Sequence, residues 1–238
     1  MPGPSPDSRH PFNGEAHTVF LKNVISRSNI VVGDYTYYHA AEHAEAFEDR
    51  NVLYHFEFIG DRLIIGKFCA LATGTGFIMN GANHAMTGFS TYPFHIFGEG
   101  WQDGFEPDTI FGHLRGDTIV GNDVWFGRDS TIMPGIEIGS GAIIGAHSVV
   151  ARDVPPYAVV AGNPGKVVKM RFPPETVTAL LSLSWWDWPI ELISKNLGAI
   201  RGADLDVLRA IAAENTRSHP SPAPEPSTRT KPHDRSLS

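Results

Sequence analysis

One histidine stands in an otherwise small and polar stretch of the chain, IMNGANHAM from Ile78 to Met86. The ordinary pKa of a histidine, about 6.5, leaves much of the ring neutral near neutral pH, so the ring can take a proton from a reacting group. A loop histidine can equally be bonded to a backbone carbonyl and take no part in chemistry. His84 is therefore a candidate general base whose role depends on its surroundings.

The chain has eleven histidines, which raises the question of a metal site. A zinc site needs ligands that converge. His84, His95, His113 and His147 form no tight cluster with cysteines or carboxylates in the sequence. We therefore expect no metal.

The single cysteine, Cys69, cannot form an internal disulfide, and as a nucleophile it would offer a covalent route for group transfer. It lies four residues after Ile65, where the repeat described next places small residues for packing. A structural thiol is the favoured interpretation, so a direct transfer is favoured over one through a covalent intermediate on this cysteine.

The segments that must position these residues have apolar residues repeated with a period of six. This is neither the period of a strand nor that of a helix. An apolar residue occurs at every sixth position from Leu114 to Val150, and the same signature appears earlier between Ile59 and Phe77. Glycine or alanine often comes one position later. The residue four positions later is small or β-branched: Thr118, Val124, Ser130, Ile136, Ala142, Ser148 and Val154.

Such a repeat suits short strands joined by tight turns, in which each unit buries one face against the next. The sequence therefore predicts an all-β-dominated fold, a parallel β-helix made of hexapeptide repeats. Period alone does not give the hand of the helix. From Pro173 the pattern becomes helical, which predicts C-terminal α-helices.

The predicted organisation has four parts: an N-terminal extension at 1–17, a β-helix domain at 18–172, a helical segment at 173–215 and a disordered tail at 216–238. The repeat is interrupted by two excursions at about 38–58 and 81–113. Loops of this length in a compact domain are usually functional or disordered. The tail is rich in Pro, Ser and charge, with nothing to bury.

The composition excludes several classes of protein. The net charge is −7 and no stripe of Lys or Arg is present, which argues against nucleic-acid binding. No segment approaches the roughly 18 apolar residues needed to cross a bilayer, and the first residues lack the pattern of a secretory leader. We expect a cytoplasmic protein that acts neither on a membrane nor on nucleic acid.

The motifs make the interpretation more specific. In chain order they are GDYTYY (33–38), IIGKFCALATGTGFIMNGANHAM (64–86), STYPF (90–94), GDTIVGNDVWFGRDSTIMPG (116–135), AGNPGKVVKMRF (161–172) and WWDWP (185–189). In these motifs the chain resembles the hexapeptide-repeat acyltransferases, and within them the xenobiotic O-acetyltransferases of the streptogramin A (virginiamycin) and chloramphenicol type. The resemblance covers about residues 12–200.

This resemblance implies a left-handed β-helix with a protruding loop, assembled as a homotrimer whose active sites lie between subunits. It also implies transfer of acetyl from acetyl-CoA to a hydroxyl of the acceptor, without a metal. His84 matches the catalytic histidine of the family. Asn83 is counted among the substrate-binding residues, where it would fix the loop beside His84, although the role of a simple turn residue explains it equally well. An alcohol needs such a base because its pKa is too high for unaided attack on a thioester.

The acceptor site is expected to be apolar with a few polar groups, in keeping with the aromatics near both excursions. By matched position, the acceptor contacts are Tyr37, Tyr54 and Trp125. Phe56 stands where some members of the family have tyrosine, so one polar contact is missing.

Coenzyme A is expected along an outer groove near the C-terminal coils. Gly127 and Gly145 are three hexads apart and would stack if three hexads form one coil. The residues assigned to the cofactor are Gly127, Ala146, Ala161, Gly162 and Lys166. Turn geometry or solvation explains each of them equally well. The three tryptophans of WWDWP are expected to pack a C-terminal helix instead of taking part in catalysis.

Two other functions remain open from the sequence. One is O-acetylation of a sugar or a cell-surface glycan, which would need more carboxylates and amides than the aromatic loops contain. The other is a β-helix that has lost catalysis and serves as a binding module.

Overall fold

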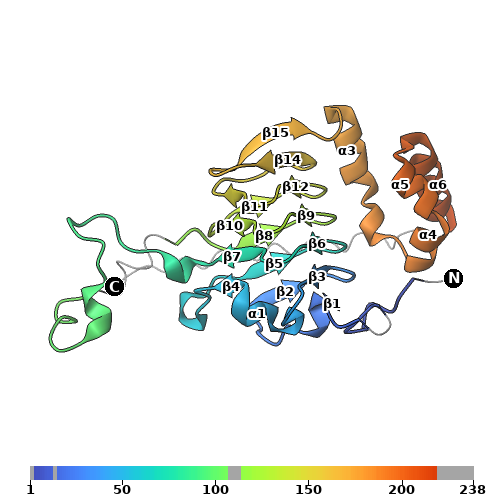
Figure 1. Cartoon of the computed structure of the whole chain (residues 1–238). Coiled ribbons are helices and arrows are strands. Elements are labelled where there is room, and N and C mark those ends of the chain that lie inside the picture. The colour runs from blue at the N-terminus through green and yellow to red at the C-terminus, as the bar shows by residue number, and fades with distance from the viewer. Residues whose placement is uncertain (1–2, 13–14, 107–113, 219–238) are drawn as a thin grey trace, which may run out of the picture. The chain divides into compact units, whose positions relative to one another are not determined.

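The computed structural model describes residues 3–12, 15–106 and 114–218, and the chain divides into two compact units at 195/196 (Figure 1). The first unit is a stack of short strands. Its strands are β1 Thr18–Phe20, β2 Ile30–Val32, β3 Tyr37–His39, β4 Val52–Leu53, β5 Leu63–Ile65, β6 Ala70–Leu71, β7 Gly76–Ile78, β8 Thr118–Val120, β9 Trp125–Phe126, β10 Thr131–Ile132, β11 Glu137–Ile138, β12 Ile143–Ile144, β13 Val149–Val150, β14 Ala158–Ala161 and β15 Lys166–Met170.

The strands form three sheets, one for each side of the coil. Their orders are β1-β3-β6-β9-β12-β14-β15, β13-β10-β7-β4 and β11-β8-β5-β2, which we call sheets A, C and B. Phe126 pairs with Ile144 in parallel, and Ile132 pairs with Val150, so three hexads make one coil. The predicted left-handed parallel β-helix is confirmed.

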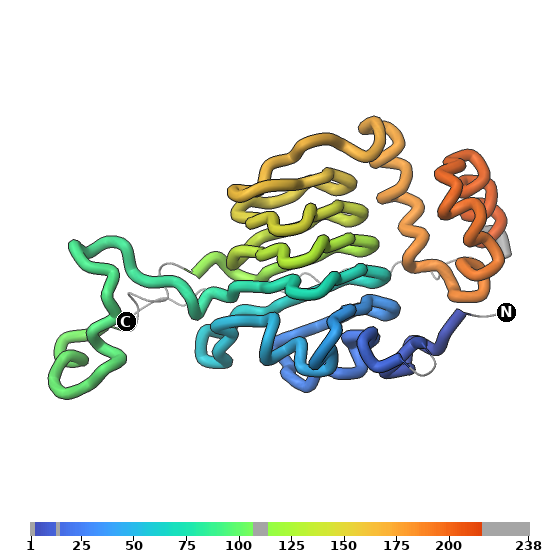
Figure 2. Tube along the Cα trace, viewed as in Figure 1, coloured from blue at the N-terminus to red at the C-terminus, as the bar shows by residue number. Residues whose placement is uncertain are grey.

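The two ends of the stack differ from its middle. β1 pairs with β3 and β15 pairs with β14 in antiparallel fashion, whereas the strands between them are parallel. An antiparallel end strand stops the repeat from offering a further parallel edge. The tube in Figure 2 follows the chain through the successive coils of the stack.

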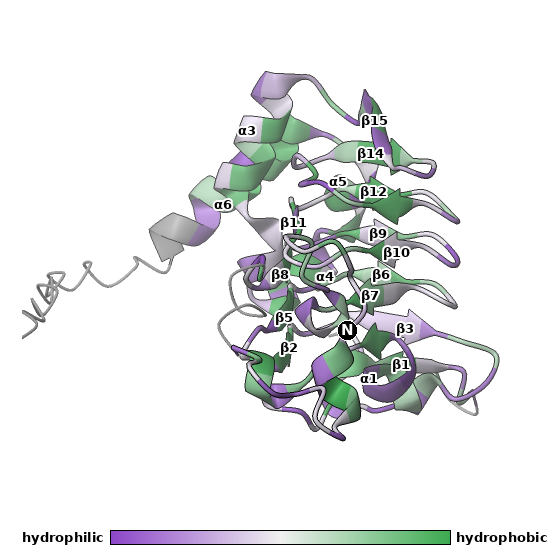
Figure 3. Cartoon of the chain, turned by 90° about the vertical axis from the view of Figure 1, so that its left-hand side faces the viewer, coloured by the Kyte–Doolittle hydropathy of each residue, from purple (hydrophilic) through white to green (hydrophobic). Residues whose placement is uncertain are grey.

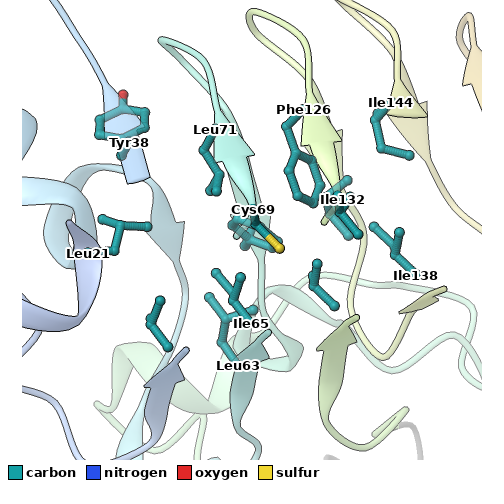
Figure 4. Packing of buried hydrophobic residues seen from close by; sticks show 14 of the residues in the cluster. Leu21, Tyr38, Leu63, Ile65, Cys69, Leu71, Phe126, Ile132, Ile138 and Ile144 are labelled. Carbon is teal, nitrogen blue, oxygen red and sulfur yellow. The ribbon is translucent and has the colours of Figure 1, made fainter. Parts of the chain in front are cut away.

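The core is a set of stacked columns. From Val120 to Val150 the residues at every sixth position are buried, whereas Leu114, the first of the predicted column, is only partly buried. The residues four positions later are buried too, from Thr118 at 0% exposure to Val154 at 5%. Figure 4 shows Leu71, Phe126 and Ile144 in a row from left to right on successive coils, and in Figure 3 the strands are mostly hydrophobic.

The helices are short. They are α1 Phe47–Arg50, α3 Pro174–Leu183 and α4 Ile190–Lys195 in the first unit, with α5 Leu197–Gly202 and α6 Leu205–Ser218 in the second. Pro174 opens α3, a position where a missing backbone N–H costs nothing. In the described part of the chain, no helix is both long and apolar enough to span a bilayer.

The WWDWP segment packs against a corner of the β-helix. Trp186 is 5% exposed, and the Trp185 ring centroid lies 5.1 Å from that of Phe68. Lys67 Nζ donates to Asp187 Oδ1 at 2.8 Å. The structural role predicted for these tryptophans agrees with this packing.

The first excursion is narrower than predicted, because Tyr38 belongs to β3 and Val52 to β4, and both are buried. The second excursion leaves after β7 and returns before β8, and its residues 107–113 lie outside the described part. In Figure 1 it projects from one side of the stack, opposite the side along which α3 runs. The predicted tail at 216–238 lies outside the described residues from 219 onward.

Candidate active site

His84 lies where the repeat gives way to the long loop. β7 ends at Ile78, a short 3-10 turn spans Asn80–Ala82, and His84 follows it, exposed. Its Nδ1 is 2.7 Å from the carbonyl oxygen of Thr91. A carbonyl can only accept, so Nδ1 carries the proton in this hydrogen bond. The neutral ring then has its lone pair on Nε2, which is the atom a general base needs.

The segment that holds His84 is itself held by aromatic packing. Tyr92 follows Thr91, and its ring stacks on Phe97 with centroids 5.2 Å apart. Phe94 and Trp101 meet edge to face at 5.2 Å. These rings remain about half exposed, so their mutual contacts hold the loop together without forming a buried core.

A groove of about 560 Å³ lies along strands β1, β3, β6 and β9 of sheet A. Tyr37 of β3 and Trp125 of β9 are exposed along it. Its walls are mainly apolar, and its polar members include His39, Thr18, Thr73 and Arg128. The structure therefore brings together two of the three residues predicted to contact the acceptor.

The N-terminal segment forms one wall of this groove, which the sequence did not predict. Pro4, Pro11 and Phe12 line it. The segment is fixed by Asn23 Nδ2, which donates to the carbonyls of Pro6 at 2.8 Å and Ser8 at 3.0 Å. Nothing in the residue types or spacing of the first twelve positions indicates this role.

Tyr54, the third predicted acceptor contact, lies elsewhere. It follows β4 with a left-handed φ of 58° and borders a separate open hollow with Phe56 and Phe58. The Tyr54 carbonyl lies so close to Gly81 that a Cβ on Gly81 would approach it to 2.3 Å. Tyr54 is thus at the base of the His84 loop.

Two groups of candidate residues therefore lie on different parts of one chain. His84, Asn83 and Tyr54 belong to the loop and its base beside sheet C. Tyr37 and Trp125 face the sheet A groove, whose lining includes no residue of the described loop at 81–106. In Figure 1 the loop leaves at the left, whereas β3 and β9 lie toward the right of the stack.

The residues predicted to contact coenzyme A share one edge of the stack. A Cβ on Gly127 would come within 2.5 Å of the Ala146 backbone nitrogen, one coil further on. Gly145 lies against Ala161, and the Gly162 N–H donates to Ser148 Oγ at 3.1 Å. The coils approach one another closely along this edge, where the residues are small.

Lys166 lies at the end of this edge. It pairs with Ala161 across the β14–β15 hairpin and lines a hollow of about 220 Å³ with Arg152. Asp153 lines the same hollow, so its two cations exceed its one acidic residue, a balance that suits a phosphate group.

Cys69 is buried in the core, with no exposed surface. Its Sγ is 3.2 Å from the Gly121 carbonyl oxygen. Burial raises the pKa of the thiol to about 12, so the nucleophilic thiolate is strongly disfavoured near neutral pH. The geometry supports the structural interpretation of this cysteine.

We predict that Cys69→Ala keeps kcat and both KM values and lowers the free energy of unfolding by about 1 kcal/mol, because a small packed group is lost. Urea unfolding and steady-state kinetics measure the two effects. Iodoacetamide should leave the native wild-type enzyme active. Loss of turnover in a folded Cys69→Ala protein would instead indicate a covalent route.

The described residues contain no group of three or more His, Cys, Asp or Glu side chains placed to hold a metal ion. His113 lies outside that part of the chain. His147, predicted to be solvated, has a side chain that is 74% exposed.

Comparison with known proteins agrees with the repeat and with the motifs. Residues 117–152 match the family described as bacterial transferase hexapeptide (six repeats). A probable macrolide acetyltransferase of Lysinibacillus sphaericus is 55% identical over 64% of this chain and 84% of its own length.

Two further relatives match over more of the chain. Virginiamycin A acetyltransferase of Staphylococcus aureus is 48% identical over 87% of this chain and 93% of its own length. Chloramphenicol acetyltransferase of Escherichia coli is 42% identical over 78% of this chain and 86% of its own length.

Proposed function

Because this chain belongs to the hexapeptide-repeat acetyltransferases that include the virginiamycin A and chloramphenicol enzymes, we propose that its acceptor is the hydroxyl of an antibiotic of streptogramin A or chloramphenicol type. The acetyl donor is acetyl-CoA. The names of the relatives support the acceptor class, and the apolar groove with Tyr37 and Trp125 suits a bulky, partly apolar alcohol.

The observation that carries the mechanism is the hydrogen bond from His84 Nδ1 to the Thr91 carbonyl. With Nδ1 protonated, Nε2 takes the proton of the acceptor hydroxyl as its oxygen attacks the thioester carbonyl carbon. The tetrahedral intermediate then collapses with cleavage of the C–S bond. The imidazolium returns the proton to the departing sulfur. The products are the free thiol of CoA and the acetyl ester, and His84 is neutral again.

The site is completed in a homotrimer. In a single chain, the base on the loop and the acceptor groove on sheet A lie on different faces, and each is exposed. Chains arranged around a threefold axis would place the loop of one subunit against the groove of the next. Such a site would contain His84, Asn83 and Tyr54 from one subunit and Tyr37 and Trp125 from its neighbour.

Coenzyme A would lie along the edge formed by Gly127, Ala146, Ala161 and Gly162, with its phosphates near Lys166. The close stacking of this edge supports the assignment, because a pantetheine chain can approach backbone groups only where side chains are small. A cytoplasmic location is part of the proposal, in keeping with one buried, reduced cysteine.

The test is acetyl-CoA turnover, read as released thiol, with streptogramin A, chloramphenicol and sugar alcohols as separate acceptors. We expect turnover with an antibiotic alcohol and a product heavier by one acetyl group on the hydroxyl. Turnover with a sugar alone would move the function to glycan acetylation. No turnover and no CoA binding in calorimetry would indicate a binding module.

A further inference from the structure

Asn80 is a buried asparagine, 1% exposed, whose side chain uses all of its hydrogen-bonding capacity. Its Nδ2 donates to Asp61 Oδ2 at 2.7 Å and to the Gly116 carbonyl at 2.8 Å. Its Oδ1 accepts from the Arg115 backbone N–H at 2.8 Å and from Asn83 Nδ2 at 3.3 Å. Four partners of the required kind also fix the orientation of the amide.

Three of these four partners come from the two ends of the long loop. Asn83 lies where the chain leaves the stack, and Arg115 and Gly116 lie where it returns. One side chain therefore joins the two ends of a loop of about thirty residues, whose closure is entropically costly. His84 is the next residue after Asn83, so the joined end is the one that presents the base.

Asp61 holds Asn80 in turn. Its Oδ2 accepts from the backbone N–H of Asn80 at 3.0 Å as well as from Nδ2. Asp61 is 4% exposed, and its Oδ1 has no hydrogen-bond partner. Because Asp61 is buried and its Oδ2 accepts both hydrogen bonds from Asn80, this carboxyl group is a strong, directional acceptor for the Asn80 amide.

Asp61 is also tied to the strand that leads to Tyr54. His55, which follows Tyr54, has a fully buried side chain, and its Nε2 donates to the Asp61 backbone carbonyl at 2.9 Å. The chain of contacts thus runs from His55 through Asp61 and Asn80 to Asn83, next to His84.

We propose that Asn80 is a positioning residue for the general base, and that Asp61 fixes Asn80 in the orientation this requires. The proposal rests on the proposed role of His84. Asn80 touches neither substrate nor cofactor in this account, and its effect on the reaction passes through the loop.

The test compares Asn80→Ala with Asn51→Ala. Asn51 is also buried, at 8% exposure, and its Nδ2 donates to the Thr75 carbonyl at 2.8 Å and to Tyr38 Oη at 3.1 Å. Both substitutions remove buried amide hydrogen bonds, but only Asn80 is bonded to the long loop. Asn51→Ala therefore shows how much kcat falls when a buried asparagine is lost without any effect on the long loop.

We expect Asn80→Ala to lower kcat by about 10- to 100-fold, because a shift of about 1 Å in a reacting group has an effect of this size. The KM for acetyl-CoA should stay within about twofold, and Asn51→Ala should keep kcat. In a His84→Ala background, Asn80→Ala should have almost no further effect on kcat, since the group it positions is gone. Asn80→Ser, which keeps one hydroxyl, serves if Asn80→Ala is not recovered folded.

Asp61→Asn is the conservative variant, because its amide oxygen can still accept both hydrogen bonds from Asn80. It should keep kcat within about threefold, whereas Asp61→Ala should resemble Asn80→Ala. Loss of activity in Asp61→Asn as severe as in Asp61→Ala would contradict the proposal.

Hydrogen exchange measured by mass spectrometry tests the positioning role of Asn80 independently of the general-base role of His84. We expect faster exchange across 81–92 in Asn80→Ala, with β9 and β12 unchanged. Unaltered loop exchange, or equal kcat in Asn80→Ala and Asn51→Ala, would overturn the positioning role. An active His84→Ala enzyme would overturn the proposed mechanism, while the exchange data would still show whether Asn80 anchors the loop.

Discussion

His84→Ala is expected to lower kcat by about 10²–10⁴-fold, the usual contribution of a positioned general base. The reason is local. Thr91 fixes the ring so that Nε2 is the free nitrogen, and no other histidine is placed on this turn. The KM for acetyl-CoA should change little, because the cofactor edge lies on other coils. Released thiol at saturating concentrations of both substrates measures the effect.

A matched substitution controls for the general loss of an imidazole. His17 is exposed and its side chain belongs to neither half of the site. His17→Ala should keep wild-type kcat, and both variants should melt within a few degrees of the parent protein. If His84→Ala keeps near wild-type turnover, His84 is not the base.

Phe126→Ala is expected to lower the free energy of unfolding by about 3–5 kcal/mol, the cost of a large cavity in a packed core. Phe126 has no exposed surface, and its ring meets that of Phe77 edge to face at 5.7 Å. It lies in the middle of the stack, with β6 on one side and β12 on the other. Its loss therefore weakens two coil interfaces. Urea unfolding followed by circular dichroism measures the change.

The preceding residue provides the control. Trp125 is 55% exposed, so Trp125→Ala should alter the free energy of unfolding by only about 0.5 kcal/mol. It should instead raise the KM for the acceptor about tenfold, since an aromatic wall of the groove is removed. Equal destabilisation by the two substitutions would contradict the assignment of Phe126 to the core and Trp125 to the groove.

The core could be predicted from the sequence because every coil repeats the same requirement. Val120, Phe126 and Ile132 must each point inward, and the same three-hexad spacing sets their partners above and below. Stacking of Gly127 on the peptide between Gly145 and Ala146 follows from that arithmetic. Local pattern and long-range contact coincide in a solenoid, which is why the prediction succeeded.

The site was harder to predict from the sequence, since its contacts join segments that share no repeat. Asp61 and Asn80 meet across a turn of the coil, and the first residues of the chain fold over the sheet A groove. Nothing in the identities of Asp61 or Pro11 indicates these contacts. The residues assigned by resemblance are exposed or partly exposed, but their division between two faces follows only from the three-dimensional arrangement.

The central claim is that His84 of one subunit acts on an alcohol held in the sheet A groove of the next. Co-expression of His84→Ala and Trp125→Ala chains tests it directly, with acetyl transfer measured at low acceptor concentration. The His84→Ala chain alone should be nearly inactive and the Trp125→Ala chain alone should keep about a tenth of the wild-type rate. An equal, random mixture should recover about a quarter of the wild-type rate, since one site in four joins two intact halves. A mixture no more active than its components would place both halves within one chain and contradict the account.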